Sequence, residues 1–315
     1  MNRQRFLYLI PPEKSFYKIR NERFIINALK DLSHDIIEIN KFYTFNLIRY
    51  CSTQKIDGII FNSLKIGMKC EKFLNLNKYN IPKYWWYFDA AKFGNRYSKV
   101  VRLAKEVDIF FNKEKNEFEN YTNMKINPIW LDQGVPSNCK FTENNNLMYD
   151  LGFFGSASEI HSNRTSILRK LDKKYNLIIY SKDYKKFIAY GFKNCYPAIN
   201  QEQISKKVSE IKITLCFNSN ASRAFCWSDR IHLMLGSGAF CLAENIEGIQ
   251  NFYKNERDCI FFNQAEDLMD KIDTWLNSNK KNEIRKNGYN TAHKKNSYQL
   301  KVEEFLTHIE KYNGN

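Results

Sequence analysis

The chain has 315 residues, of which 43% are hydrophobic and 15% are aromatic. This length and composition exclude a disordered chain and favour two globular domains, each large enough to bury its own core. No apolar run approaches the ~20 residues that a membrane span requires. The N-terminus runs from Arg5 directly into an apolar strand-like stretch and has no small-residue cleavage site, so we expect a cytoplasmic protein.

The formal net charge of +15 has three possible causes. It could be a solvated lysine-rich surface, an attraction to anionic lipid at the inner face of a membrane, or an attraction to nucleic acid. The eight cysteines include no Cys-x-x-Cys pair and no Cys/His cluster at zinc spacing. We therefore expect reduced thiols, no metal site and no bound cofactor.

Strands and helices alternate through the first part of the chain. Apolar runs predict strands at 6–10, 35–39, 56–61, 81–89, 107–111 and 126–131, and helices between them at 16–32, 42–51 and 68–76. This alternation is typical of βαβ units with right-handed crossovers and a parallel sheet. It predicts a first Rossmann-like domain at 1–145, with an Asn-rich linker near its end.

The strand at 81–89 is aromatic and ends in an acid, Asp89. A carboxylate beyond the carboxyl end of a parallel strand faces the ligand side of the sheet. Asp89 is therefore a candidate general base or acceptor-binding residue, unless it caps a helix that begins at Ala90. Trp86 is a further acceptor-side candidate, although a core position would suit it equally. Asp132 and Gln133, which follow the strand at 126–131, complete this group.

The second domain, predicted at 146–296, opens with a strand and a small-residue loop that lead into a helix. Gly155 and Ser156 would let the backbone approach a phosphate, the helix N-terminus would supply N–H donors, and Arg164 could reach a diphosphate. A tight turn explains Gly155 equally well. Further strands are predicted at 177–180, 213–217, 239–243 and 259–262.

The stretch from Ser228 to Asn245 is the most informative part of the sequence. Ser228 begins a short apolar helix, and Gly236 and Gly238 end it before a fully apolar strand. Arg230 in the first turn either pairs with Asp229 or binds an anion. Glu244 and Asn245 follow the strand, where Glu244 either caps a helix or accepts hydrogen bonds from the hydroxyls of a sugar.

Arg230, followed by Gly238, a short apolar strand, Glu244, Gly248 and Phe252, resembles the C-terminal half of the CgeB-like (spore maturation type) glycosyltransferases. The resemblance covers about residues 150–310. It implies a GT-B fold, in which two Rossmann-like domains face a cleft and the final helix, here 297–315, returns to the first domain. It also implies donor binding by Gly155, Ser156, Arg164, Arg230, Glu244 and Asn245. The family's glutamate three residues after the arginine is replaced here by Leu233.

These observations predict a metal-independent glycosyltransferase that uses a nucleotide-sugar, UDP- or GDP-linked, as co-substrate. Arg230 and Asp89 would carry the chemistry, and the acceptor would be a hydroxyl of a glycan, protein or small molecule. Two alternatives remain at this point. The acceptor could be a modified base of DNA, which the positive charge would favour, or the protein could bind a nucleotide-sugar or glycan without catalysis, since Leu233 departs from the family pattern.

Overall fold

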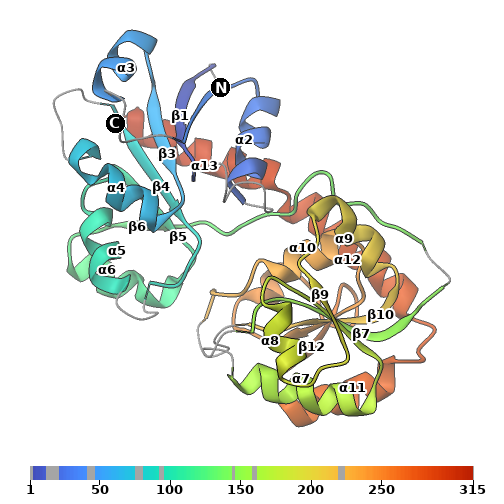
Figure 1. Cartoon of the computed structure of the whole chain (residues 1–315). Coiled ribbons are helices and arrows are strands. Elements are labelled where there is room, and N and C mark those ends of the chain that lie inside the picture. The colour runs from blue at the N-terminus through green and yellow to red at the C-terminus, as the bar shows by residue number, and fades with distance from the viewer. Residues whose placement is uncertain are drawn as a thin grey trace. The chain divides into compact units, whose positions relative to one another are not determined.

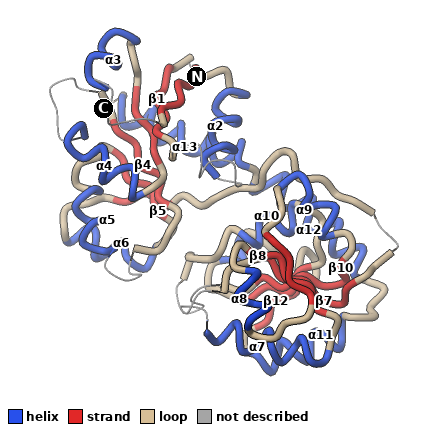
Figure 2. Tube along the Cα trace, viewed as in Figure 1, coloured by secondary structure: helices blue, strands red, loops and turns tan. Residues whose placement is uncertain are grey.

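The computed structural model describes residues 3–11, 21–40, 47–74, 81–91, 96–143, 146–157, 162–218 and 224–314. The chain divides into two compact units, Met1–Gln133 with Tyr298–Asn315, and Gly134–Ser297. In the described residues each unit is built on a six-stranded parallel sheet with helices around it (Figures 1 and 2). The predicted α/β class is confirmed. The predicted boundary after residue 145 lies inside the second unit.

The first sheet has the strand order β2-β1-β3-β4-β5-β6, and all of its strand pairs are parallel. Residues 16–20 and 42–46 of two predicted helices lie outside the described residues; the remainder corresponds to α2 and α3. The elements of this part of the unit are β1 (Arg5–Leu9), α2 (Asn21–Asp31), β2 (Asp35–Ile39), α3 (Leu47–Gln54), β3 (Gly58–Phe61), α4 (Leu64–Leu74), β4 (Lys83–Tyr87), α5 (Tyr97–Ala104), β5 (Ile109–Asn112), η3 (Lys115–Glu117), α6 (Phe118–Asn123) and β6 (Pro128–Trp130).

The aromatic strand β4 is buried on both faces, and its side chains alternate between two cores. Tyr84 and Trp86 lie in the core under α2 and the C-terminal helix, whereas Trp85 and Tyr87 lie in the opposite core with residues of α4 and α5. This alternation follows from the two-residue period of a strand. A continuous aromatic run is therefore what a strand covered by helices on both sides requires.

The last helix, α13 (Tyr298–Asn313), belongs to the first unit although it follows the whole of the second in sequence. Figure 1 shows it in red beside the dark-blue α2, and the two helices are in contact. Phe305 anchors α13 on the sheet. Its ring stacks on Trp86 with centroids 5.5 Å apart, and it lies 4.9 Å from the ring of Phe111.

We expect Phe305→Ala to destabilise the first unit by about 3–5 kcal/mol, because it leaves a cavity among buried aromatic rings. Leu300→Ala on the same helix is the matched control, since Leu300 is 38% exposed, and it should change stability by no more than about 0.5 kcal/mol. Urea unfolding followed by tryptophan fluorescence measures both. Equal losses for the two variants would contradict the packing of α13 described here.

The second sheet has the order β12-β11-β10-β7-β8-β9, again with parallel pairs throughout. The short edge strand β9 was not predicted from the sequence. The elements of this unit are β7 (Tyr149–Phe154), α7 (Ser162–Lys174), β8 (Leu177–Ser181), α8 (Tyr184–Ala189), β9 (Asn194–Pro197), α9 (Gln201–Val208), β10 (Ile211–Cys216), α10 (Arg230–Gly236), β11 (Cys241–Glu244), η5 (Ile249–Asn251), β12 (Ile260–Phe262), α11 (Ala265–Trp275) and α12 (Lys281–Asn296).

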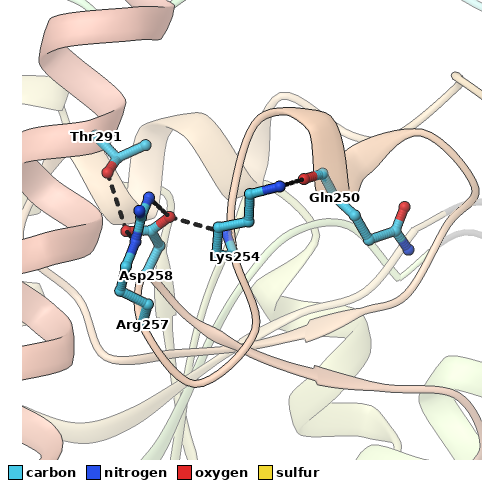
Figure 3. Close-up of polar contacts among 5 residues, drawn as sticks. All are labelled: Gln250, Lys254, Arg257, Asp258 and Thr291. Carbon is cyan, nitrogen blue, oxygen red and sulfur yellow. Dashed lines mark hydrogen bonds and ion pairs between the residues drawn. The ribbon is translucent and has the colours of Figure 1, made fainter.

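A buried carboxylate, Asp258, fixes the segment between β11 and β12 (Figure 3). Its oxygens accept hydrogen bonds from the backbone N–H of Lys254 at 2.8 Å and from the hydroxyl of Thr291 on α12 at 2.9 Å. The guanidinium of Arg257 completes the set through Nε at 3.0 Å and Nη2 at 2.7 Å. A buried charge that is fully hydrogen-bonded in this way holds the segment against α12.

Candidate functional site

The order of the strands in the second unit marks one place in its sheet. The chain runs from β7 to β8 and β9 on one side, then returns to β10 on the other side of β7. The direction of winding therefore reverses between β7 and β10. In open parallel sheets, ligands bind beyond the carboxyl ends of the strands at this reversal. Gly155 directly follows β7, and Phe217 and Asn218 follow β10.

Arg230 spans this reversal with its guanidinium. Nε donates to the carbonyl oxygen of Phe154, the last residue of β7, and Nη1 donates to the carbonyl oxygen of Phe217, just after β10. Both bonds therefore go to main-chain carbonyls and not to the carboxylate of Asp229. The guanidinium therefore joins two strand ends through neutral acceptors.

Arg164 on α7 lies beside Arg230 on the same aromatic ring. The guanidinium carbons of Arg164 and Arg230 lie 5.0 and 5.1 Å from the centroid of Phe153. Arg164 Nη2 donates to the carbonyl oxygen of Ser156 at 2.6 Å, whereas its buried Nε has no hydrogen-bond partner in the described part of the chain. Two neighbouring cations with an unused donor are suited to bind an anion.

The charge balance of these arginines supports the same conclusion. Burial and the nearby charge of Arg230 lower the pKa of the Arg164 guanidinium to about 9, and Glu244 opposes this shift. Burial also lowers the pKa of Arg230. Each positive charge is thus disfavoured in the free protein. A bound diphosphate would relieve this, because its negative charge favours the protonated form of both groups.

Glu244 stands at the end of β11, on the same side of the sheet. Its Oε2 accepts a hydrogen bond from the backbone N–H of Asn218 at 2.7 Å, and Asn218 Nδ2 donates to the carbonyl oxygen of Glu244 at 3.2 Å. Burial raises the pKa of Glu244, while Asn218 and the two arginines act in the opposite direction. An ionised carboxylate has about four acceptor positions, so others remain for the hydroxyls of a ligand.

Asn218 is a site residue that the sequence pattern did not single out. Its Oδ1 accepts from the backbone N–H of Ser228 at 2.7 Å, and the hydroxyl of Ser228 accepts from the N–H of Arg230 at 3.3 Å. Asn218 therefore links Glu244 to the start of the Arg230 helix. The only sequence signal was its place directly after an apolar strand, which many loop residues share.

Gly155 contributes space and not a phosphate donor. Its N–H is bonded to the carbonyl oxygen of Tyr180 at 3.1 Å. A Cβ at this position would lie 2.7 Å from Arg230 Nη2 and 2.6 Å from the ring of Phe153. Glycine is therefore required for the close approach of Arg230. Ser156 takes part through its main-chain carbonyl, and residues 158–161, the predicted helix N-terminus, lie outside the described residues.

Asn245 adjoins Glu244, but its side chain serves the loop. Its Oδ1 accepts from the side-chain amide of Gln250, and its Nδ2 donates to Asn263 at 2.9 Å.

The helix α10 is held by hydrogen bonds among three buried aromatic side chains. Trp227 Nε1 donates to His232 Nε2 at 3.0 Å, and His232 Nδ1 lies 2.7 Å from the hydroxyl of Tyr253.

The first unit separates the four predicted acceptor-side residues. Trp86 was placed wrongly at the acceptor side: it is fully buried in the core and donates to the carbonyl oxygen of Leu131. Asp132 and Gln133 are buried as well, and Gln133 accepts a hydrogen bond from Lys113 at 3.0 Å. Their burial keeps these three side chains from a ligand in solution.

Asp89 alone of this group is exposed. Its Oδ2 lies 3.7 Å from Nη1 of Arg96. The described helix after β4 begins at Tyr97, and residues 89–91 are not helical, so Asp89 does not cap a helix that starts at Ala90. An exposed carboxylate beyond β4 remains available to accept a proton.

Neither a metal cluster nor a membrane span is seen in the described parts of the chain. No group of three His, Cys, Asp or Glu side chains in these ranges is placed to hold a metal ion. Within the same ranges, no helix is both long and apolar enough to cross a bilayer.

Residues 164–307 match a family model described as glycosyl transferase-like, and this range includes Arg164, Arg230 and Glu244. The match covers most of the second unit and the first part of α13. The match confirms the predicted glycosyltransferase, and it lies in the C-terminal part of the chain. A comparison with curated proteins gave no match.

Solved structures with the GT-B fold resemble the chain over its whole length. HepE from Anabaena in complex with UDP and glucose has a TM-score of 0.72 at 12% identity, covering 98% of this chain and 100% of its own. Sucrose-phosphate synthase from Thermosynechococcus elongatus has a TM-score of 0.75 at 10% identity, covering 99% and 100%. A glycosyltransferase from Rickettsia africae has a TM-score of 0.65 at 15% identity, covering 100% of both chains. At these identities the likeness establishes the fold.

We expect Gly155→Ala to destabilise the second unit by about 1–3 kcal/mol, because the added methyl group collides with Arg230 and Phe153. Ser156→Ala is the matched control: it keeps the carbonyl that Arg164 uses and should be near neutral. Urea unfolding compares the two. Unchanged stability in Gly155→Ala would show that Arg230 does not occupy the position described.

Proposed function

We propose that this glycosyl transferase-like protein moves a sugar from a nucleotide-sugar to a hydroxyl acceptor. The observation that carries the proposal is the pair Arg230 and Arg164 at the reversal between β7 and β10, where two cations share one ring and Glu244 is the carboxylate that acts on both. A diphosphate fits this charge, and the acceptor positions of Glu244 fit the vicinal hydroxyls of a ribose.

The proposed chemistry uses these charges on the leaving group. The acceptor oxygen forms a bond to the anomeric carbon, the bond from that carbon to the diphosphate breaks, and its electron pair stays on the diphosphate. Arg230 and Arg164 stabilise the charge that develops there, so we propose that transfer needs no metal ion. The exposed Asp89 accepts the proton of the acceptor hydroxyl.

We propose a UDP-linked donor ahead of a GDP-linked one, because HepE, which has the same fold, forms a complex with UDP and glucose. A place in the CgeB-like subfamily is supported by Arg230, Gly238 and Glu244 at the spacing noted above. Leu233, where that subfamily has glutamate, counts against it and leaves room for a protein that binds a donor without transferring its sugar.

Arg230→Lys is expected to lower sugar transfer about 10²–10³-fold, because an ammonium group cannot bridge the two strand-end carbonyls and face the diphosphate as well. The first measurement is thermal stabilisation by UDP-, GDP-, ADP-, dTDP- and CMP-sugars, with and without EDTA, followed by release of the nucleoside diphosphate. Wild-type protein should be stabilised by a few degrees by one nucleotide class, with EDTA present or absent.

Arg169→Lys, an exposed position on α7, is the control and should keep full activity. Stabilisation that disappears with EDTA would contradict the metal-independent mechanism. Donor binding without release of the diphosphate would favour a non-catalytic binding protein, and full transfer by Arg230→Lys would remove Arg230 from the mechanism.

The pH dependence of donor binding should report Glu244. Because burial raises its pKa, Glu244 becomes protonated on acidification before an ordinary glutamate does. We therefore expect the affinity for UDP-glucose to fall as pH drops through this raised pKa. Glu244→Gln should bind weakly, with a flatter pH profile.

The same raised pKa affects folding stability. Protonated Glu244 contributes stability at low pH, and this contribution is lost as pH rises through the raised pKa.

The exposed Glu247→Gln is the control and should keep the wild-type profile. Calorimetric titration between pH 4 and 8 measures the affinities, and urea unfolding over the same range measures stability. An identical pH profile for wild type and Glu244→Gln would show that Glu244 does not contact the donor.

A further inference from the structure

The first unit has an open pocket of about 360 Å³ between α4 and α5. It is lined by Leu64, Lys65, Met68, Lys69, Arg96 and Lys99. Its volume is within the range of small-molecule sites, which begins at about 300 Å³. Neither the sequence motifs nor the donor site accounts for it.

The lining combines positive charge with a small apolar floor. Lys65, Lys69, Arg96 and Lys99 are all exposed, whereas Leu64 and Met68 are half-buried. Among the described residues that line the pocket there is no carboxylate. Glu71, an acid on the same helix, pairs with Arg102 at 2.7 Å, and Arg102 is not part of the lining. Arg96 faces the carboxylate of Asp89, whereas the three lysines of the lining would attract a ligand with negative charge.

The position of the pocket connects it with Asp89. Leu64 and Lys65 begin α4, which follows β3, and Arg96 immediately precedes α5, which follows β4. The pocket thus lies toward the carboxyl ends of the strands, the side on which ligands of parallel sheets bind. Arg96, which lines the pocket, also lies 3.7 Å from the exposed carboxylate of Asp89.

We propose that this pocket binds the phosphate group of a small phosphorylated acceptor, so that a hydroxyl of the same molecule reaches Asp89. The proposal rests on the transferase function above and names its acceptor class. Lysine ammonium groups bind phosphate as point charges, and several of them can share one dianion. A neutral glycan or a nucleic acid strand would be expected to use aromatic stacking surfaces, and the described lining residues include no aromatic side chain.

The test compares glucose 6-phosphate with glucose by calorimetric titration of the full-length protein. Glucose 6-phosphate should bind at least about tenfold more tightly than glucose, a difference of about 1.4 kcal/mol. The preference should weaken as salt is raised from 50 to about 500 mM, because the charges are exposed. Equal affinity for the two sugars would overturn the proposal without any variant being needed.

The triple variant Lys65→Gln/Lys69→Gln/Lys99→Gln should lose about tenfold in affinity for glucose 6-phosphate. Lys105→Gln, an exposed lysine that follows α5 and lies outside the lining, is the matched control and should bind as wild type. Unchanged affinity in the triple variant would overturn the assignment. Urea unfolding followed by tryptophan fluorescence shows that each variant is folded, because Trp85 and Trp86 are buried in the same unit as the altered lysines.

Two further measurements, release of UDP from UDP-glucose and binding of lipid vesicles, separate this inference from the transferase function and identify the source of the phosphate. Lysine-dependent binding of glucose 6-phosphate without any release of UDP from UDP-glucose would keep the phosphate pocket and reject the transferase. Release of UDP with no preference for glucose 6-phosphate would do the reverse. Tighter, lysine-dependent binding of phosphatidylglycerol vesicles would support the same phosphate chemistry and assign it to a lipid headgroup, whereas vesicle binding that ignores the lysines would overturn it.

Discussion

The Arg230 guanidinium, bonded to the carbonyls that end β7 and β10, is the interaction on which the second unit's site depends. A half-buried cation requires acceptors, and strand-end carbonyls at a reversal of strand order supply them without neutralising the charge. Gly155 must lack a Cβ for the guanidinium to fit, and Asn218 ties the Arg230 helix to Glu244. The guanidinium of Arg230 therefore constrains which residue can stand at position 155, and its helix is tied to Glu244 through Asn218.

Arg164 makes this arrangement costly for the free protein. Burial and the nearby charge of Arg230 lower the pKa of Arg164 to about 9, and Arg164 Nε has no acceptor in the described residues. Unsatisfied charge is uncommon in a folded interior and tends to occur at functional sites. The proposed diphosphate would satisfy the same donors and charges, so the free energy that disfavours them in the free protein would contribute to its binding.

The sequence predicted the strands of both sheets well, because strands covered on two faces are continuous apolar runs. It missed β9, whose residues Asn194–Pro197 form a short edge strand with little apolar character. Arg164, Arg230 and Glu244 were selected from strand ends and helix starts. Asn218 was not, because its bond to Glu244 joins residues far apart in the chain. Trp86 was misplaced, since an aromatic run does not show which side chains reach the surface.

The two units have different side chains at the point where the strand order of each sheet reverses. In the first unit the strand order reverses between β1 and β3, and there the hydroxyl of Tyr8 donates to Asn62, whose Nδ2 donates to the carbonyl oxygen of Trp86 at 2.8 Å. These groups are buried and neutral. At the corresponding place in the second sheet lies the guanidinium of Arg230. In the described residues, the exposed Asp89 and the lysines of α4 and α5 lie beyond β3 and β4 instead, and this difference is the basis for proposing that the first unit serves the acceptor and the second the leaving diphosphate.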